Sequence, residues 1–204
     1  MKPMFAAAAL AAALVAPAAH ACLNGMRHEL MERRDTFVAG ASKAYRDGKF
    51  TDAVFQAERG LAASPSSGDR RALLRTLGLA NLKLGRFEKS AESFNTLLAD
   101  KKEPFVQTKL AESQVRLAES KGSVDEDAKA VLEKQAADGM LSDADAYTAL
   151  ATARNRAGDA AGARAACERA LTVQPGHPEA TQLLSTLPVP KPAAAEPVKP
   201  TSKS

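Results

Sequence analysis

The chain has 204 residues and a formal net charge of +4, and aromatic residues make up only 4% of it. Ala and Leu dominate the apolar residues, and no segment after residue 21 alternates apolar and polar residues over the length of a strand, so the sequence predicts an all-α protein without a sheet. Basic and acidic residues are interspersed and nearly balanced in number, which excludes the strongly basic surface of a nucleic-acid-binding protein.

The first 21 residues predict a secretory signal peptide. Lys2 precedes an Ala-rich apolar run from Phe5 to Val15, and Ala19-His20-Ala21 has the small-x-small pattern of a cleavage site. Cleavage near Ala21-Cys22 predicts a periplasmic or secreted protein. The run is shorter than the roughly 20 apolar residues that a membrane span needs, and no later segment reaches that length.

Cys22 leaves an alternative open, because a cysteine directly after a signal peptide can carry the acyl chains of a bacterial outer-membrane lipoprotein. In that case the chain would act as a lipid-anchored assembly factor. Ala19 and His20 fit a lipoprotein processing site poorly, so ordinary cleavage is favoured over lipidation at Cys22. The only other cysteine is Cys167. A disulfide between the two would join the amino terminus to the far end of the predicted stack, which the short reach of a disulfide disfavours.

Regularly spaced glycines are the strongest signal in the rest of the chain. Gly48, Gly85, Gly122 and Gly158 are separated by 37, 37 and 36 residues, and such a period predicts stacked repeats. Apolar residues on both sides of each glycine have helical spacing, and glycine suits the left-handed conformation at a helix end. Each glycine is therefore predicted to join two antiparallel helices. Residues 22–33 are expected to extend the first of them.

The fourth unit, Ala144 to His177, shows the pattern most completely: a large residue, then Leu and a small residue, the turn glycine, an Ala in the second helix, an Ala-Leu pair and a closing proline. This pattern resembles the tetratricopeptide repeat family. The first unit, 34–67, keeps it except for Gly60, where the family prefers Ala. The second unit, 71–104, lacks the closing proline, and the third, 105–140, is degenerate.

The resemblance implies an all-α solenoid of about four helix-turn-helix repeats. Loop residues such as Ser66 to Asp69 are expected to absorb the few residues by which each unit exceeds the family's length. A further amphipathic helix over 179–184 is expected to cap the stack, which gives a repeat domain over 34–187. The proline-rich tail, 188–204, is expected to be disordered.

No catalytic, cofactor or metal site is predicted. His20, His28 and His177 share no ligand spacing, and His177 is expected to be an exposed loop residue. Cys167 lies on the inner stripe of a helix, which predicts a buried thiol that packs as a small hydrophobic group. The acidic run Asp125 to Asp127 fits a helix amino terminus better than a calcium loop. An enzyme with an unrecognised site remains a remote alternative.

The resemblance also implies that the first helix of each pair lines a concave groove for a protein or peptide partner, so the predicted function is that of an exported, non-catalytic protein–protein interaction module. Basic residues in the groove would suit a carboxylate-bearing segment. The alternative interpretation is that Arg46, Lys83 and Arg156 are only cations that complement helix carboxyl ends. The candidate groove residues are Ser42, Arg46, Arg75, Leu79, Lys83, Glu112, Arg116, Thr148, Thr152, Asn155 and Arg156.

Overall fold

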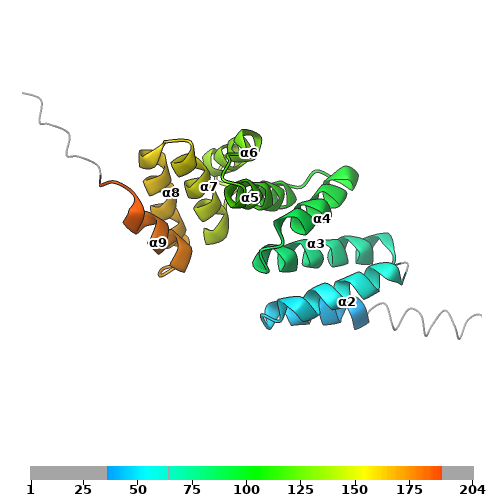
Figure 1. Ribbon diagram of the computed structural model, residues 1–204. Helices are drawn as coiled ribbons and strands as arrows, with labels where there is room; N and C mark the ends of the chain where they lie inside the picture. Colours follow the sequence, from blue (N-terminus) through cyan, green and yellow to red (C-terminus); the bar gives the residue numbers. More distant parts are fainter. Residues whose placement is uncertain (1–35, 64, 190–204) are drawn as a thin grey trace, which may run out of the picture. The chain divides into compact units, whose positions relative to one another are not determined.

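The structure is a computed structural model that describes residues 36–63 and 65–189, and within these ranges it contains helices and no strand. A first helix spans 36–46. The helices that follow are α2 (Phe50–Ala62), α3 (Ser67–Lys83), α4 (Phe87–Asp100), α5 (Pro104–Ser120), α6 (Glu126–Ala137), α7 (Ala144–Arg156), α8 (Ala160–Val173) and α9 (Pro178–Thr186) (Figure 1). The prediction of an all-α helical repeat fold with a capping helix is confirmed. The predicted signal peptide, Cys22 and the tail after residue 189 lie outside the described residues.

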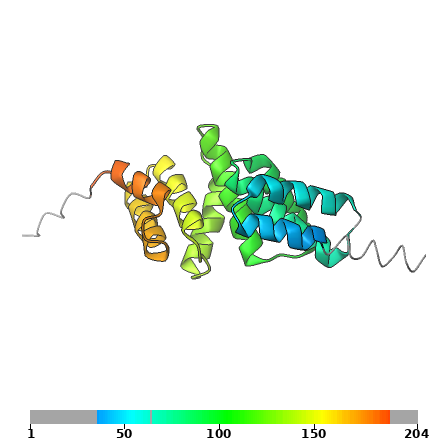
Figure 2. The same cartoon turned by 90° about the horizontal axis from the view of Figure 1, so that it is seen from below.

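The chain divides into two compact units, one ending at Lys102 and the other beginning at Glu103. The first unit contains the first helix, α2, α3 and α4, and the second contains α5 to α9. In the first unit, the first helix, blue in Figure 2, lies alongside α2 in cyan. In the second, α5 packs against α6 and α7 packs against α8.

The four predicted turn glycines all have positive φ angles, as expected for helix ends. At Gly158 the φ angle is 86°, a conformation in which residues with a Cβ are strained. The turn returns two backbone bonds to the end of α7: the Gly158 N–H donates to the Asn155 carbonyl (3.0 Å) and the Asp159 N–H donates to the Arg154 carbonyl (2.9 Å). Glycine at this point lets the last carbonyls of α7 keep their partners while the chain reverses.

The prediction that Ser66 to Asp69 form a loop is wrong. Helix α3 begins at Ser67, and the Ser66 hydroxyl caps it by accepting from the Asp69 N–H at 3.2 Å. Helices α3 and α5 each have 17 residues, whereas α2 has 13 and α4 has 14. The longer repeat is thus accommodated by longer first helices, because a Ser followed three residues later by Asp supplies a helix start rather than a loop.

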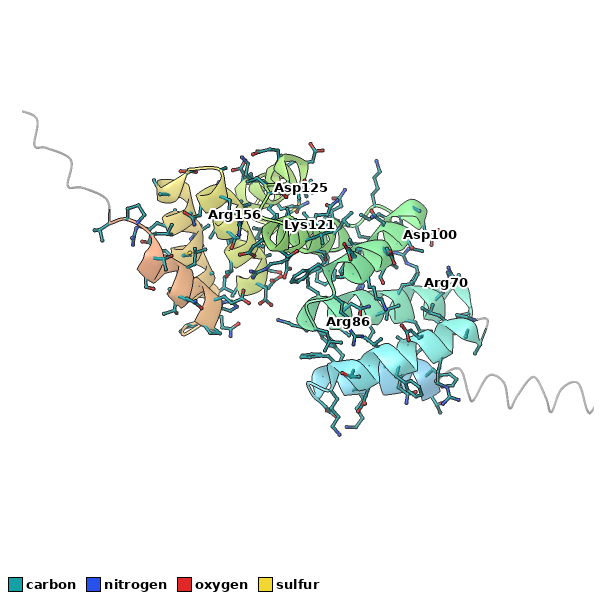
Figure 3. All side chains as sticks on the ribbon, in the orientation of Figure 1. Arg70, Arg86, Asp100, Lys121, Asp125 and Arg156 are labelled. Carbon is teal, nitrogen blue, oxygen red and sulfur yellow. The ribbon has the colours of Figure 1, made fainter. Side chains whose placement is uncertain are left out.

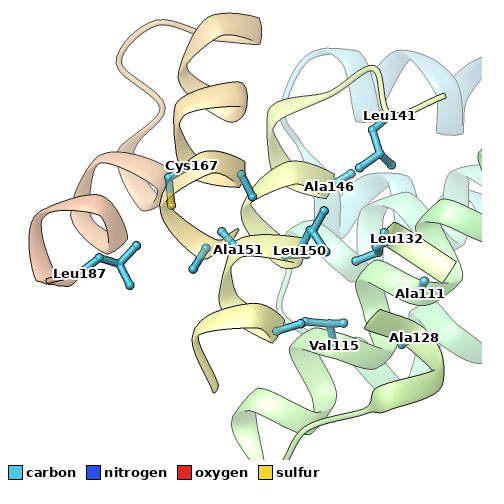
Figure 4. Close-up of a cluster of buried hydrophobic side chains, with 14 residues drawn as sticks. Ala111, Val115, Ala128, Leu132, Leu141, Ala146, Leu150, Ala151, Cys167 and Leu187 are labelled. Carbon is cyan, nitrogen blue, oxygen red and sulfur yellow. The ribbon is translucent and has the colours of Figure 1, made fainter. Parts of the chain in front are cut away.

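The core of the second unit is rich in alanine. Figure 4 shows the buried cluster, in which side chains of α5, α6, α7 and α8 meet and most of the residues are alanines. Leu132 and Leu150, which are 0% and 1% exposed, are among its larger members. Cys167 is completely buried in this cluster, which confirms its prediction as a small hydrophobic residue. Burial raises the pKa of its thiol, so the reactive thiolate is disfavoured.

The first unit packs larger side chains against glycines. Phe94 of α4 is completely buried and lies so close to Gly78 of α3 that a Cβ there would be 2.8 Å from the ring Cζ atom. Gly60, the departure from the family's preferred Ala, is equally tight, since a Cβ would lie 2.8 Å from Leu73 Cδ1 and 3.0 Å from Phe37 Cβ. The absent side chains let these helices approach closely enough to bury the large neighbours.

Candidate functional site

An open groove of about 420 Å³ lies on the second unit, between α5, α7 and α9. These helices are the first helices of the successive pairs and the capping helix, and α7 contacts both of the others. We call this surface the second-unit groove. Its lining residues are Arg116, Glu119, Thr148, Thr152, Asn155, Arg156, Glu179, Gln182, Leu183 and Thr186.

The floor of the second-unit groove is a stripe of uncharged polar residues on α7. Thr148, Thr152 and Asn155 are spaced by four and three residues, which places them on one helical face. Thr148 is 1% exposed and donates its hydroxyl hydrogen to the Ala144 carbonyl at 2.7 Å, while Asn155 is exposed. Short threonine side chains leave the groove open and still place oxygen atoms at its base.

The charges that line the second-unit groove balance one another. Arg116 of α5 pairs with Glu119 on its own helix (3.4 Å) and with Glu179 at the start of α9. Burial alone would lower the pKa of Arg116, but the two carboxylates raise it, so the guanidinium is held charged in this network. Arg156, labelled in Figure 3, is the last residue of α7 and is exposed. With two arginines and two glutamates, the groove has no excess positive charge.

His177 positions the amino terminus of α9, the helix that carries one wall of the groove. The prediction of an exposed loop histidine is wrong, because His177 is only 5% exposed. Its Nδ1 accepts from the Ala180 N–H (3.3 Å) as the helix cap, and its Nε2 lies 3.2 Å from Asp145 Oδ1. A histidine before Pro178 can thus act as an N-cap, a use that its residue type alone does not indicate.

A buried ion pair on α5 lies beside the amino terminus of α7. Lys109 Nζ is 2.7 Å from Glu112 Oε2 and 3.1 Å from Asp143 Oδ1, and Asp143 in turn caps α7 by accepting from the Ala146 N–H. Glu112 was expected to project into the groove but is 3% exposed and bonded to Lys109 instead. Burial alone would lower the pKa of Lys109, yet the two carboxylates raise it. The first helix of the third repeat thus buries charged side chains that are bonded to one another and to the cap of the next helix.

A second groove, of about 400 Å³, lies on the first unit. It is formed by the first helix, α3 and α4, and we call it the first-unit groove. Two arginines on α3 border it, and no acidic residue is among those that line it. Its lining residues are Ser42, Gly68, Arg71, Ala72, Arg75, Thr76 and Leu97.

The structure distributes the predicted groove residues over both surfaces. Ser42 and Arg75 line the first-unit groove. The second-unit groove contains Arg116, Thr148, Thr152, Asn155 and Arg156. Neither groove is lined by Arg46, Leu79 or Lys83, of which Leu79 is half-buried and the two basic residues are exposed.

Sequence reasoning missed the contribution of the capping helix. Gln182 and Thr186 lie 34 residues after Thr148 and Thr152, so they occupy the same repeat positions on α9. Extending the repeat alignment into the capping helix would have found them. Glu119 is also one turn from Arg116 and would have been found by the same helical spacing.

The chemistry of the two grooves is that of hydrogen bonding and ion pairing. Among residues 36–63 and 65–189, no cluster of three or more His, Cys, Asp or Glu side chains could hold a metal ion. In the same part of the chain, no helix is both long enough and apolar enough to cross a membrane. Amides, hydroxyls and guanidinium groups in an open groove can bind a polar chain that lies along it.

Comparison with known proteins identifies the fold. No protein-family model and no curated protein matches the sequence. Among solved structures, a crystal structure of MamA protein is 21% identical with a TM-score of 0.52 and covers 75% of this chain and 79% of its own. MamA from Desulfovibrio magneticus RS-1 is 18% identical, with coverages of 74% and 81% and a TM-score of 0.53.

A thermophilic TPR protein from Thermus thermophilus is 22% identical to the chain. It covers 74% of this chain and 79% of its own, with a TM-score of 0.55. At such identities the likeness shows the fold alone. Together with the four glycine-linked helix pairs, it shows that the chain is a tetratricopeptide-like helical repeat protein.

Proposed function

We propose that this chain is an exported, non-catalytic protein–protein interaction module that binds an extended peptide segment of a partner in the second-unit groove. The observation that carries the proposal is the set of uncharged hydrogen-bonding side chains that α7 and α9 present to one open groove. Thr152, Asn155 and Gln182 are central members of this set.

The groove suits the main chain of an extended peptide. Each peptide unit has one donor and one acceptor, and the amides of Asn155 and Gln182 offer both. Both residues are exposed, so a partner can reach their amides without displacing the core. Leu183, partly buried against the second-unit core, adds an apolar contact at the wall of the groove. Main-chain recognition would then fix the register of the peptide, and its side chains would add specificity.

The non-catalytic part of the proposal rests on the state of the carboxylates. Glu119 and Glu179 are the acidic residues of the groove, and both are bonded to Arg116. The groove's threonine hydroxyls have no histidine or lysine among the lining residues to act as a base, whereas covalent catalysis needs a nucleophile beside a base. The groove is therefore better suited to binding than to bond cleavage.

Affinity capture from the exported fraction of the source cell tests the proposal. The bait is the mature chain from Cys22 onward, compared with Asn155→Ala/Gln182→Ala and with the matched control Asn95→Ala/Gln174→Ala. All four residues are exposed, and the control pair lies outside both grooves. We expect a partner that the wild type and the control retain and that the groove variant loses by at least about tenfold, since each lost hydrogen bond costs roughly 1 kcal/mol. Equal retention by the groove variant would refute the site.

Export is a separate part of the proposal and rests on the sequence of residues 1–21. Intact mass measurement of the protein isolated from its source tests it. A chain that begins at Cys22 without added mass supports a periplasmic or secreted protein. An added mass equal to the acyl groups of a lipoprotein would replace that location with membrane anchoring at Cys22.

A further inference from the structure

The outer side of α2 carries an exposed aromatic and basic cluster that lines neither groove. Phe55 is 53% exposed, although the opposite side of the same helix, with Ala53 and Ala57, is completely buried. Arg59 follows one turn later and is also exposed. Its guanidinium carbon lies 5.4 Å from the centre of the Phe55 ring and 5.5 Å from the centre of the Phe37 ring on the first helix. The two rings therefore hold the arginine in place on the surface.

An acidic residue lies on the same side of α2. Asp52, Phe55 and Arg59 are spaced by three and four residues, so they share one helical face, and all three are exposed. Within residues 36–63 and 65–189, neither Asp52 nor Arg59 forms an ion pair. We call these three residues the outer α2 face. Each charge on it can therefore pair with a charge on another molecule.

The order of these residues makes the outer α2 face complementary to itself. Phe55 lies nearly midway between the acidic and the basic residue. When two copies of α2 run antiparallel about a two-fold axis at Phe55, Asp52 of each copy faces Arg59 of the other. The register that brings the two Phe55 rings together is therefore also the register that pairs the charges. A parallel arrangement would instead place like charges side by side.

We propose that the outer α2 face joins two copies of this chain into an antiparallel homodimer. Contact between the Phe55 rings removes exposed aromatic surface from water, and aromatic and arginine side chains are enriched at the centres of protein interfaces. The contacts with Phe37 and Phe55 already order Arg59, so it loses less side-chain freedom when the ion pair forms.

The dimer is expected to be weak and reversible. The face extends over roughly two turns of α2, which is at the low end of the size of protein interfaces. It lies on the first unit and shares no residue with the second-unit groove. The dimer is therefore independent of the proposed function, and its test needs no partner protein.

Analytical ultracentrifugation of the full mature chain, from Cys22 onward, tests the proposal. Reducing conditions prevent a disulfide between copies. The concentration is varied over about a thousandfold range that ends near the millimolar level, because weak complexes form only there. The wild type is expected to change from monomer to dimer within this range. Phe55→Ala should weaken dimerisation by at least about tenfold, since it removes the centre of the interface.

Charge reversal tests the antiparallel register. Arg59→Asp leaves only acidic charges on the face, and Asp52→Arg leaves only basic ones, so each variant alone should dimerise at least about tenfold more weakly than the wild type. An equimolar mixture of the two variants should form dimers with about the affinity of the wild type, because every acidic residue then faces a basic one. This recovery would also show that both variants are folded.

The matched controls reverse exposed charges of the same unit away from α2. Glu92→Arg on α4 and Arg70→Asp on α3 change residues that line neither groove. Each control variant should dimerise as the wild type does. Helix content by circular dichroism is measured on every variant.

Three results would overturn the proposal. A wild type that stays monomeric over the whole range would show that this face does not join two copies. A dimer that persists unchanged in Phe55→Ala and in the charge-reversal variants, or that is weakened equally in the controls, would remove the outer α2 face as its interface. A mixture of Arg59→Asp and Asp52→Arg that stays monomeric while the wild type dimerises would reject the antiparallel register.

Discussion

The two units use the same pair-by-pair arrangement of helices but fill their interiors differently. In the first unit, large residues such as Phe94 lie against glycines such as Gly78. In the second, alanines such as Ala149 and Ala163 belong to one buried cluster, and the Lys109–Glu112 ion pair is also buried. Close helix contact therefore has two solutions in this chain, a large side chain over a glycine or a series of small side chains. The sensitivity of each unit to mutation should differ accordingly.

The largest expected effect is in the second unit, at the buried ion pair. Lys109→Met leaves Glu112 buried without its partner, and removing one member of a buried pair destabilises a protein by roughly 3–5 kcal/mol. Urea unfolding monitored by circular dichroism measures the loss. The matched control is Lys134→Met, which breaks an ion pair with Asp138 whose lysine is 75% exposed and should change little. The double variant Lys109→Met/Glu112→Leu should recover most of the loss.

The same pair predicts a pH dependence. Burial raises the pKa of Glu112 above its ordinary value of 4.5, although Lys109 opposes the rise. When the pKa of a carboxyl group is higher in the folded than in the unfolded protein, protonation of that group stabilises the folded state. This stabilisation is complete below the unfolded pKa and is lost as the pH rises through the folded pKa. Without Lys109 this effect is larger, so the stability deficit of Lys109→Met should shrink as pH falls from 7 towards about 4.5. A deficit that is constant over this range would contradict an ionised, buried Glu112.

The next effect is in the first unit, where Gly78 supports Phe94. Gly78→Ala should lower the free energy of unfolding by ~1–3 kcal/mol, because the new Cβ would lie 2.8 Å from the Phe94 ring and force the core to shift. Gly68→Ala on the same helix is the control. It has space for a Cβ and should gain up to about 1 kcal/mol from the higher helix propensity of Ala. If both substitutions stabilise the chain, the close contact with Phe94 does not restrict position 78 to glycine.

The smallest effect concerns the cap of α9. His177→Ala removes the acceptor for the Ala180 N–H and should cost ~1 kcal/mol, the usual value of an N-cap. His177→Asn keeps an acceptor at this position and should lose less. Hydrogen exchange of the amides in the first turn of α9 provides the local measurement. Unchanged protection in the alanine variant would show that packing, and not the cap, fixes this helix.

The repeat organisation could be predicted from the sequence because its signals are local. A glycine after a run of helical periodicity needs no distant residue to end a helix, and the positive φ angles of Gly48, Gly85, Gly122 and Gly158 agree with that prediction. Pro178 likewise marked the start of the capping helix. The start of α3 was missed although Ser66 and Asp69 carry a local capping signal, because the family length suggested a loop.

The candidate sites were predicted only in part. The resemblance to the repeat family implied that Thr148, Thr152 and Asn155 face the groove, and the structure places them in its lining. It could not show that Glu112 turns inward to Lys109, or that Glu179 of α9 neutralises Arg116 of α5. Those pairings depend on which helices become neighbours.

By itself, the sequence determined the all-α class, the repeat period and the glycine turns, because backbone propensity and turn geometry act over a few residues. Only the tertiary structure decided the electrostatic character of each groove. A charged side chain attracts a partner only if neighbouring side chains do not already neutralise its charge. For Arg116 one such neighbour is Glu179, which lies 63 residues later in the chain. The family resemblance placed a groove on the first helices, and the packing of distant helices decided that the groove of the second unit is charge-balanced.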